Sequence, residues 1–337
     1  MQRKKILITG ASGFIGGFLV NEALKRNYEV WAGIRIGSNK SNLLGKGVNF
    51  IYLPYKNEQE LADCIKRHSE IWGRWDYVIH NAGVTKTRKK HQFCEVNAEN
   101  TKRLLKALSK YAAPKKFIFM SSLSSYGSKD EKQYTPIKID DKQNPNTEYG
   151  KSKLKAENYV RYQSDIPYII LKPTGVYGPG EKDYFNEIKS ISSGIDCSIG
   201  YKTQQLTFIY VKDLARVCFD AIENENIKNR EYLISDGNVY TDREFAAYIQ
   251  ELIGRKKILH LRLPGFIVYI ACLVSELASH LFKFDTMFNT DKYKILKQRN
   301  WKCDITPIRE DLGFVPQYTL KEGLKESIIW YKNKKWL

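Results

Sequence analysis

The chain has 337 residues, which suits one large domain or a large domain that carries a smaller lobe. Its 55 basic and 37 acidic residues give a formal net charge of +18, and 42% of its residues are hydrophobic, so a disordered or collagen-like chain is excluded. The six cysteines form no CxxC pair, so we expect neither a metal site nor a disulfide framework, and the expected compartment is a reducing cytoplasm.

Basic runs occur at 86–90, 255–257 and 332–335. No RNP, zinc-finger or basic-zipper pattern accompanies them, so we do not expect a nucleic-acid partner. Such runs are typical of solvated loops and helix faces, and the same excess of charge suits an anionic small molecule.

The first half of the chain alternates short, continuous apolar runs with longer amphipathic stretches. The expected strands are 5–9, 29–34, 49–53, 77–80, 117–121 and 168–172. The expected helices are 14–26, 58–67, 97–111 and 151–162. Buried parallel strands joined by crossover helices predict an α/β fold with a doubly wound parallel Rossmann sheet.

After Pro173 the pattern becomes irregular, with frequent Gly, Pro and Ser. A strand and helix at 207–222 resemble the first half again, and helices resume at Thr241. We therefore expect a Rossmann domain made of 1–175 plus about 205–235. The remaining segments, about 176–204 and 236–337, are expected to form a smaller, discontinuous substrate lobe.

The apolar segment 263–282 has the length of a membrane span, but it contains Glu276 and His280. An acid in the middle of a span is costly in lipid, so we predict a buried helix and keep a membrane-surface helix as the less favoured alternative. Glycines interrupt the apolar stretch within 1–20, so we do not interpret it as a signal peptide.

A glycine-rich turn follows the first expected strand and opens the first helix. Its sequence from Thr9 is TGASGFIG, which places glycines at a G-x-x-G-x-x-G spacing. Glycines there allow a tight turn, a close approach of the backbone to a pyrophosphate and close helix packing, with the pyrophosphate at the helix N-terminus. The residues expected to bind a dinucleotide are Gly10, Gly13, Phe14, Ile15 and Gly16.

The second expected strand ends at Arg35, where an NAD-binding unit usually has an acid for the ribose 2′-hydroxyl. No acid occurs between Glu29 and Glu58, and Ser38 and Lys40 follow closely. A 2′-phosphate would meet a cation and a donor here, so the sequence favours NADP over NAD. The alternative is that Arg35 only stacks on the adenine.

Tyr149 and Lys153 lie four residues apart at the start of an expected helix, so they share one face. Ser122 ends a buried strand that should run beside them. A neighbouring ammonium stabilises a phenolate, so Lys153, together with an oxidised nicotinamide, is expected to lower the pKa of Tyr149. Taken alone, Y-x-x-x-K is also common on an ordinary surface helix.

Together these motifs resemble the extended short-chain dehydrogenase/reductase family, in its NAD-dependent epimerase/dehydratase branch. The resemblance covers nearly the whole chain. The matching stretches are TGASGFIG at 9–16, HNAG at 80–83, Asn97 in VNAENT, MSSLSSYG at 120–127, YGKSK at 149–153, KPTGVYGPG at 172–180 and FIYVKDLA at 208–215.

The resemblance implies a role for each matching residue. Tyr149 would be the acid/base, Lys153 would hold the nicotinamide ribose, and Ser122 would bind the substrate oxygen, which makes these three the catalytic set. Ser124 would line the substrate pocket. The remaining residues implied for the cofactor are Ala82, Gly83, Asn97, Pro173 and Val176. The family also implies a small-molecule substrate and a homodimer. For Asn97 and Ser124, a helix cap and a loop hydroxyl remain equally good interpretations.

The chain also departs from the family. Pro54 stands where many relatives have an aspartate near the adenine, and Lys172 replaces a frequent arginine. Leu206 occupies a place where nucleotide-sugar enzymes often have an arginine on the diphosphate, and Leu123 and Ser124 replace the acidic pair usual in dehydratases.

The predicted function is therefore NAD(P)-dependent hydride transfer at a secondary alcohol or ketone carbon, with Tyr149 moving the proton. The alternatives are a nucleotide-sugar 4-epimerase, a steroid- or dihydroflavonol-type ketone reductase, and a non-catalytic dinucleotide-sensing protein.

Overall fold

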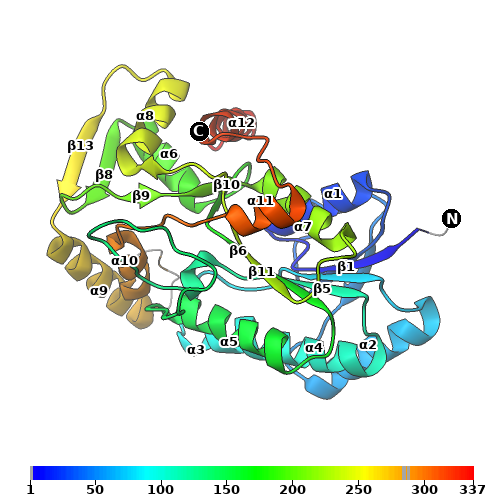
Figure 1. The fold of residues 1–337 in the computed structure, drawn as a ribbon. Helices are drawn as coiled ribbons and strands as arrows, with labels where there is room; N and C mark the ends of the chain where they lie inside the picture. The colour runs from blue at the N-terminus through cyan, green and yellow to red at the C-terminus, as the bar shows by residue number, and fades with distance from the viewer. Residues whose placement is uncertain (1–2, 283–285, 287–288) are drawn as a thin grey trace.

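The computed structural model describes residues 3–282, 286 and 289–337, and a seven-stranded parallel sheet lies at its centre (Figure 1). The strands are β1 (Lys5–Thr9), β2 (Glu29–Ile34), β3 (Asn49–Tyr52), β4 (Tyr77–His80), β5 (Lys116–Met120), β6 (Tyr168–Pro173) and β11 (Arg230–Ile234). Their order in the sheet is β11-β6-β5-β4-β1-β2-β3. The chain reverses its direction of winding at β1, which separates β2 and β3 from β4, and ligands of open parallel sheets bind at such a point.

Helices cover both faces of the sheet (Figure 1). One face carries α1 (Phe14–Lys25), α7 (Val211–Glu223) and α11 (Thr306–Leu312). The other face carries α2 (Glu58–Trp72), α4 (Asn100–Tyr111) and α5 (Glu148–Tyr162). Most strand residues are buried because both faces are covered, which explains the continuous apolar runs in the sequence.

Short elements connect the sheet to its surroundings. They are α3 (His91–Phe93), the π-helix η1 (Cys94–Glu99), the 3₁₀-helix η2 (Leu123–Ser125), β7 (Gly175–Tyr177) and β10 (Phe208–Tyr210). β7 and β10 pair with each other and do not join the main sheet.

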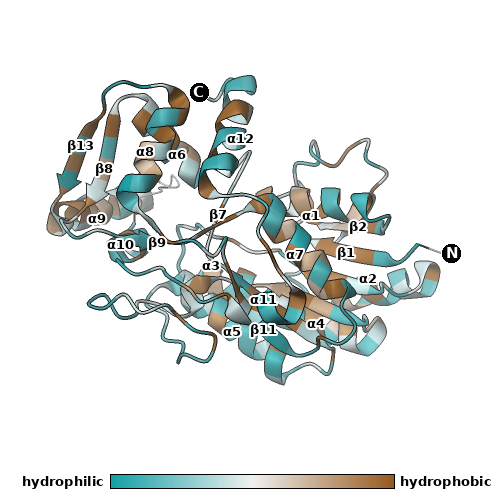
Figure 2. Cartoon of the chain, turned by 45° about the horizontal axis from the view of Figure 1, so that its top comes forward, coloured by the Kyte–Doolittle hydropathy of each residue, from teal (hydrophilic) through white to brown (hydrophobic). Residues whose placement is uncertain are grey.

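A smaller group of elements lies above and to one side of the carboxyl ends of the strands (Figures 1 and 2). They are α6 (Asp183–Ser192), β8 (Ile195–Ile199), β9 (Gln205–Leu206), β12 (Tyr240–Thr241), α8 (Asp242–Ile253), β13 (Leu259–Leu263), α9 (Gly265–Phe282), α10 (Thr290–Lys297) and α12 (Leu320–Asn333). Capping boxes begin α8 at Thr241 and α12 at Thr319. The predicted substrate lobe includes 283–285 and 287–288, which lie outside the described residues.

The doubly wound parallel sheet is confirmed, and all six predicted strands are present within about one residue of their predicted ends. The sequence prediction missed the seventh strand, β11. It also expected the strand at the start of 207–222 to resemble the core strands, whereas that segment forms β10 outside the main sheet, and only its helix, α7, covers the sheet.

The prediction of a buried helix over 263–282 is wrong. The helix is present as α9, but Val274, Leu277 and Leu281 are 58%, 61% and 74% exposed. Burial depends on what packs against a helix. Among the described residues α10 packs against α9, and these three side chains stay exposed.

Candidate active site

One large cavity lies at the carboxyl ends of the central strands and extends into the smaller lobe. Its volume is about 1990 Å³. Pockets for a single small ligand usually measure roughly 300–1,000 Å³, so this cavity has room for a dinucleotide and a second molecule.

The glycine-rich turn forms one wall of this cavity. Gly10 has φ +66°, and a Cβ there would lie 2.9 Å from the backbone of Ala82. A Cβ on Gly16 would lie 2.1 Å from the carbonyl oxygen of Gly10, so α1 packs against the turn too closely for any side chain. Gly13 is the N-cap residue of α1, and no side chain caps the first backbone N–H groups of the helix. The turn and the open helix N-terminus therefore fit the pyrophosphate of a dinucleotide.

A hydrogen-bonded chain fixes the neighbouring wall. Thr9 Oγ1 accepts the Ala82 N–H at 3.1 Å and lies 2.7 Å from His80 Nδ1. His80 Nε2 lies 2.9 Å from Thr101 Oγ1, which donates to the Asn97 carbonyl. Burial lowers the pKa of His80 to about 3, so its neutral ring links β1, β4 and the π-helix. In the sequence His80 stands out only as part of the HNAG motif, and no local pattern indicates this role.

Asn97 supports the same wall from behind. Its Oδ1 accepts the Val84 N–H at 2.8 Å, and its Nδ2 donates to the Val84 carbonyl and to Ser152 Oγ, both at 3.0 Å. Asn97 is buried and does not line the cavity, so it acts as a positioning residue for the segment after Gly83. Its place in a π-helix is typical of functional sites.

The far end of the cavity lies beyond β2 and β3. Arg35 and Ser38 line it, and so does Lys56, which the sequence analysis missed because it follows β3 instead of β2. Ser38 Oγ accepts the Arg35 N–H at 3.1 Å, which holds the turn. Lys40 does not line the cavity; its ammonium donates to the Tyr52 hydroxyl at 2.7 Å.

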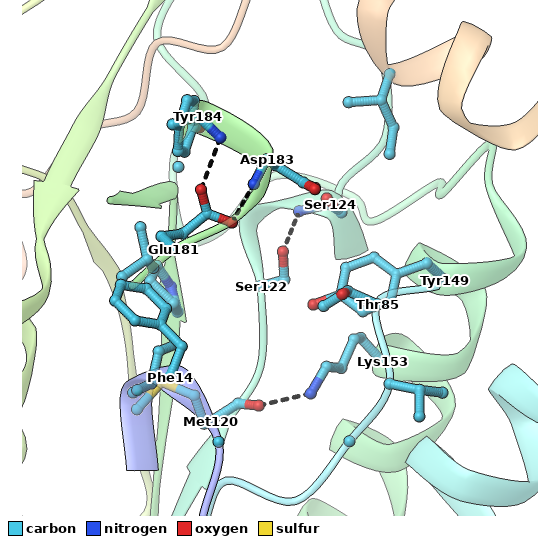
Figure 3. A pocket seen from close by; sticks show the side chains of 18 of the residues that line it. Phe14, Thr85, Met120, Ser122, Ser124, Tyr149, Lys153, Glu181, Asp183 and Tyr184 are labelled. Atoms are coloured by element: carbon cyan, nitrogen blue, oxygen red, sulfur yellow. Dashed lines mark hydrogen bonds between the residues drawn. The ribbon is translucent and has the colours of Figure 1, made fainter. Parts of the chain in front are cut away.

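Ser122, Tyr149 and Lys153 converge in the middle of the cavity (Figure 3). β5 ends at Met120, and Ser122 is the N-cap of η2, where its Oγ accepts the Ser124 N–H at 3.1 Å. Lys153 Nζ donates to the Met120 carbonyl at 2.8 Å.

Gly150 explains why the start of α5 lies so close to η2. A Cβ on Gly150 would lie 2.3 Å from the Ser124 carbonyl oxygen, so only glycine lets the two elements touch. Thr147 caps α5 by accepting the Gly150 N–H at 3.0 Å. The first turn of α5, which carries Tyr149, is thereby placed beside the two serines.

The ionisation of the central groups is set first by burial. Burial raises the pKa of Tyr149 to about 12, and a hydrogen bond with Ser122 opposes the rise. Burial lowers the pKa of Lys153 to about 8, against a smaller opposing effect of Glu157. The expected lowering of the pKa of Tyr149 requires an oxidised nicotinamide beside Lys153, so it stays a prediction for the cofactor-bound enzyme, and burial acts in the opposite direction. At neutral pH the tyrosine holds its proton beside a mostly charged lysine.

Aromatic and apolar side chains wall the part of the cavity inside the smaller lobe. The Tyr184 ring centroid lies 5.6 Å from that of Phe208 and 5.8 Å from that of Phe245. Gly175 makes this possible, because a Cβ there would lie 2.1 Å from the Tyr184 hydroxyl. The other apolar lining residues include Leu206, Leu263, Val268, Ile295, Leu296 and Trp301. The sequence analysis missed this cluster, since its members are scattered over more than 100 residues.

Charged side chains also line that end. The carboxylates are Glu181, Asp183, Glu187, Asp196 and Asp242, and the Lys and Arg side chains are Arg243, Arg262 and Lys292. Lys292 pairs with Asp183 at 3.3 Å, and Glu181 accepts the backbone N–H groups of Asp183 and Tyr184 at the start of α6 (Figure 3). Carboxylates thus outnumber cations at the substrate end of the described lining.

The structure brings most of the predicted site residues to one cavity. The predicted residues that line it are Gly10, Gly13, Phe14, Ile15, Arg35, Ala82, Gly83, Ser122, Ser124, Tyr149, Lys153, Pro173 and Val176. Gly16 and Asn97 do not line it and instead support the turn and the wall. Within the described residues, no group of three or more His, Cys, Asp or Glu side chains is arranged to hold a metal ion.

Comparison with known proteins agrees with this geometry. The sequence profile of the NAD dependent epimerase/dehydratase family matches residues 6–235. The UDP-glucose 4-epimerase of Vibrio cholerae is 29% identical over 337 residues, which cover 96% of this chain and 94% of that protein. The 3-beta-hydroxysteroid dehydrogenase of Mycolicibacterium neoaurum is 25% identical, over 97% of this chain and 91% of that protein.

Among solved structures, the UDP-glucose 4-epimerase of Thermotoga maritima with UDP-glucose superposes with a TM-score of 0.77. The match covers 98% of this chain and 99% of that chain at 22% identity, so it supports the fold. The family profile spans the glycine-rich turn, the serine-bearing loop and the Tyr149–Lys153 helix. The chain is therefore an enzyme of the NAD-dependent epimerase/dehydratase family.

Proposed function

We propose that this enzyme catalyses net hydride transfer between a nicotinamide cofactor, NADP in preference to NAD, and a secondary alcohol or ketone on a largely apolar substrate. The observation that carries the proposal is the meeting of Ser122, Tyr149 and Lys153 in one cavity with the glycine-rich turn. A bound nicotinamide supplies the hydride to the carbonyl carbon in reduction, or accepts it in oxidation.

The protein side chains handle the proton. In reduction, Tyr149 donates its hydroxyl proton to the carbonyl oxygen as that oxygen gains negative charge, and Ser122 hydrogen-bonds the same oxygen. The raised pKa of Tyr149 keeps the proton in place at neutral pH, which suits a general acid. Lys153 stabilises the phenolate that remains, and the Met120 carbonyl orients its ammonium.

The preference for NADP rests on the far end of the cavity. Arg35 and Lys56 are two cationic lining residues there, and Ser38 adds a hydroxyl. A 2′-phosphate gains charge-assisted hydrogen bonds from such a set. Glu60 also lines the adenine end, so the cation that would chiefly select the 2′-phosphate is Arg35 at the end of β2.

The proposed substrate carries no diphosphate anchor. Leu206 lines the cavity where an arginine would serve a nucleotide sugar. A lost charge-assisted bond costs about 1.5–3 kcal/mol. The cluster around Tyr184, Phe208 and Phe245 offers contact to a hydrophobic ring system instead.

We expect UDP-, GDP- and dTDP-sugars to leave the melting temperature of the cofactor-loaded protein nearly unchanged. A ligand at about 100 times its Kd stabilises by about 2.7 kcal/mol, which would raise Tm by several degrees. The matched variant Leu206→Arg should respond more strongly to these sugars than the wild type. Clear stabilisation of the wild type at micromolar concentration would contradict the proposal.

A nucleotide-sugar 4-epimerase is the second candidate. Arg243 and Arg262 line the substrate end, and their guanidinium groups are the type of donor that a diphosphate requires. In that reaction the hydride would return to the same substrate. The relative from Vibrio cholerae gives this candidate its other support.

A further inference from the structure

Helix α9 is amphipathic, but its apolar side is exposed, which is the reverse of the usual arrangement at a protein surface. Glu276 faces the protein: it pairs with Lys90 at 2.8 Å and accepts the Thr290 hydroxyl at 2.7 Å. Ser279 is 2% exposed, and the buried side also holds Cys272 at 0%. Among the described side chains of α9, the exposed ones are mainly apolar.

These apolar residues recur every three to four positions, so they form one continuous stripe. These side chains are called the outer stripe, and each is between 38% and 74% exposed. They are Phe266, Ile270, Leu273, Val274, Leu277 and Leu281. In Figures 1 and 2, α9 lies at the edge of the molecule below β13 and β8, and in Figure 2 much of its ribbon has the brown of hydrophobic residues. An exposed apolar stripe of this length marks an interaction surface.

A transmembrane role does not fit the stripe. No helix in the described part of the chain is long and apolar enough to cross a membrane. The 18 residues of α9 span about 27 Å along the helix axis, and one side is attached to the protein. A helix with one apolar side can instead lie in the plane of a lipid surface.

The charges beside α9 favour an anionic surface. Lys90 of the neighbouring loop contacts α9. Lys294 and Lys297 are exposed on α10, which packs against α9, and Lys294 also pairs with Asp291 at 3.5 Å. Glu276 is the only acid in α9, and its side chain is 16% exposed and paired. The whole chain has a net charge of +18. A second copy of this chain would bring the same cations to the same face, whereas an anionic bilayer attracts them.

We infer that the outer stripe of α9 docks this enzyme on an anionic lipid surface, with the helix lying in the interface and the flanking lysines contacting headgroups. Val268, on the opposite side of α9, lines the substrate end of the cavity. The docked helix therefore separates the lipid surface from that end of the cavity. This inference does not depend on the reaction proposed above.

Flotation with phosphatidylcholine vesicles, with and without phosphatidylglycerol, tests the inference directly. The wild type should bind the vesicles that contain phosphatidylglycerol, and high salt should weaken that binding. The double variant Ile270→Glu/Leu277→Glu should bind at least about tenfold more weakly, because two apolar side chains leave the interface.

The matched control is Ile71→Glu/Val315→Glu. These side chains are 64% and 69% exposed, similar to 53% for Ile270 and 61% for Leu277, and they belong to α2 and to the segment after α11. The control should bind vesicles like the wild type. The charge reversal Lys294→Glu/Lys297→Glu leaves the outer stripe intact and should reduce binding to anionic vesicles. This variant tests the inference even if Ile270→Glu/Leu277→Glu does not fold.

Three results would overturn the inference. The first is equal vesicle binding by the wild type and by a folded Ile270→Glu/Leu277→Glu variant. The second is vesicle binding by the wild type that is changed neither by salt nor by the presence of phosphatidylglycerol. The third is no vesicle binding together with a dimer, measured by light scattering, that this variant converts to a monomer, since the stripe would then bind a second copy of the chain.

Discussion

Replacing Tyr149 with phenylalanine is expected to lower kcat by at least about 100-fold, the usual cost of losing a general acid or base. The ring keeps its place at the start of α5, so only the hydroxyl that carries the transferable proton is removed. Calorimetric affinity for the cofactor should stay nearly unchanged. The rate is measured as NADPH oxidation with a ketone that the wild type reduces.

The control for this variant is Tyr184→Phe, which removes a hydroxyl from the wall of the same cavity. Tyr184 packs against Phe208 and Phe245. We therefore expect removal of its hydroxyl to change kcat by less than about tenfold. Unaltered turnover in Tyr149→Phe would refute the assignment of the acid/base. Another group in the cavity would then have to move the proton.

Replacing Arg35 with aspartate should lower the ratio of NADP affinity to NAD affinity by at least about 100-fold. The wild-type guanidinium offers the 2′-phosphate a charge-assisted hydrogen bond worth about 1.5–3 kcal/mol, and a carboxylate in its place adds repulsion. The same carboxylate can accept hydrogen bonds from the 2′- and 3′-hydroxyls of NAD. Titration of both cofactors by calorimetry gives the ratio.

Lys40→Asp is the matched control, because it makes the same change of charge five residues away. Lys40 contacts the Tyr52 hydroxyl and does not line the cavity, so the ratio should change by no more than about threefold. If the wild type binds NAD as tightly as NADP, or if Arg35→Asp leaves the ratio unchanged, Arg35 has another role and the cofactor is NAD.

The central sheet was predictable because its strands are buried on both faces and therefore appear as continuous apolar runs. β11 was missed because its sequence, REYLI, begins with two charged residues and lies at the edge of the sheet. Glu231 is in fact partly buried and pairs with Lys172 at 2.7 Å. No local pattern reveals a partner 59 residues away.

The orientation of α9 was unpredictable for a related reason. Its composition is apolar enough to suggest burial. Its orientation, however, depends on the contacts of Glu276 with Lys90 and Thr290. Lys90 lies far away in the sequence, and Thr290 lies beyond the end of the helix. Hydrophobic content indicates that a helix needs a partner. It does not indicate whether that partner belongs to the same chain.

The candidate site was predictable where its residues lie in short motifs. The glycine-rich turn and the Tyr149–Lys153 pair each occupy a few consecutive positions, and their geometry follows from a strand, a turn or one helical turn. Lys56 and the aromatic cluster around Tyr184 come from separate elements, so only the folded chain brings them together. The pKa of Tyr149 likewise depends on burial, which the spacing to Lys153 does not report.

The central claim, net transfer of hydride to a substrate that then leaves, is tested most directly by native mass spectrometry of the purified enzyme. A reductase or dehydrogenase must exchange its cofactor in every cycle, so we expect an empty site after desalting and a mass increase when NADPH is added. A tightly held cofactor that does not exchange with added NADPH would contradict the claim and identify the enzyme as one that returns the hydride to its own substrate, as a 4-epimerase does.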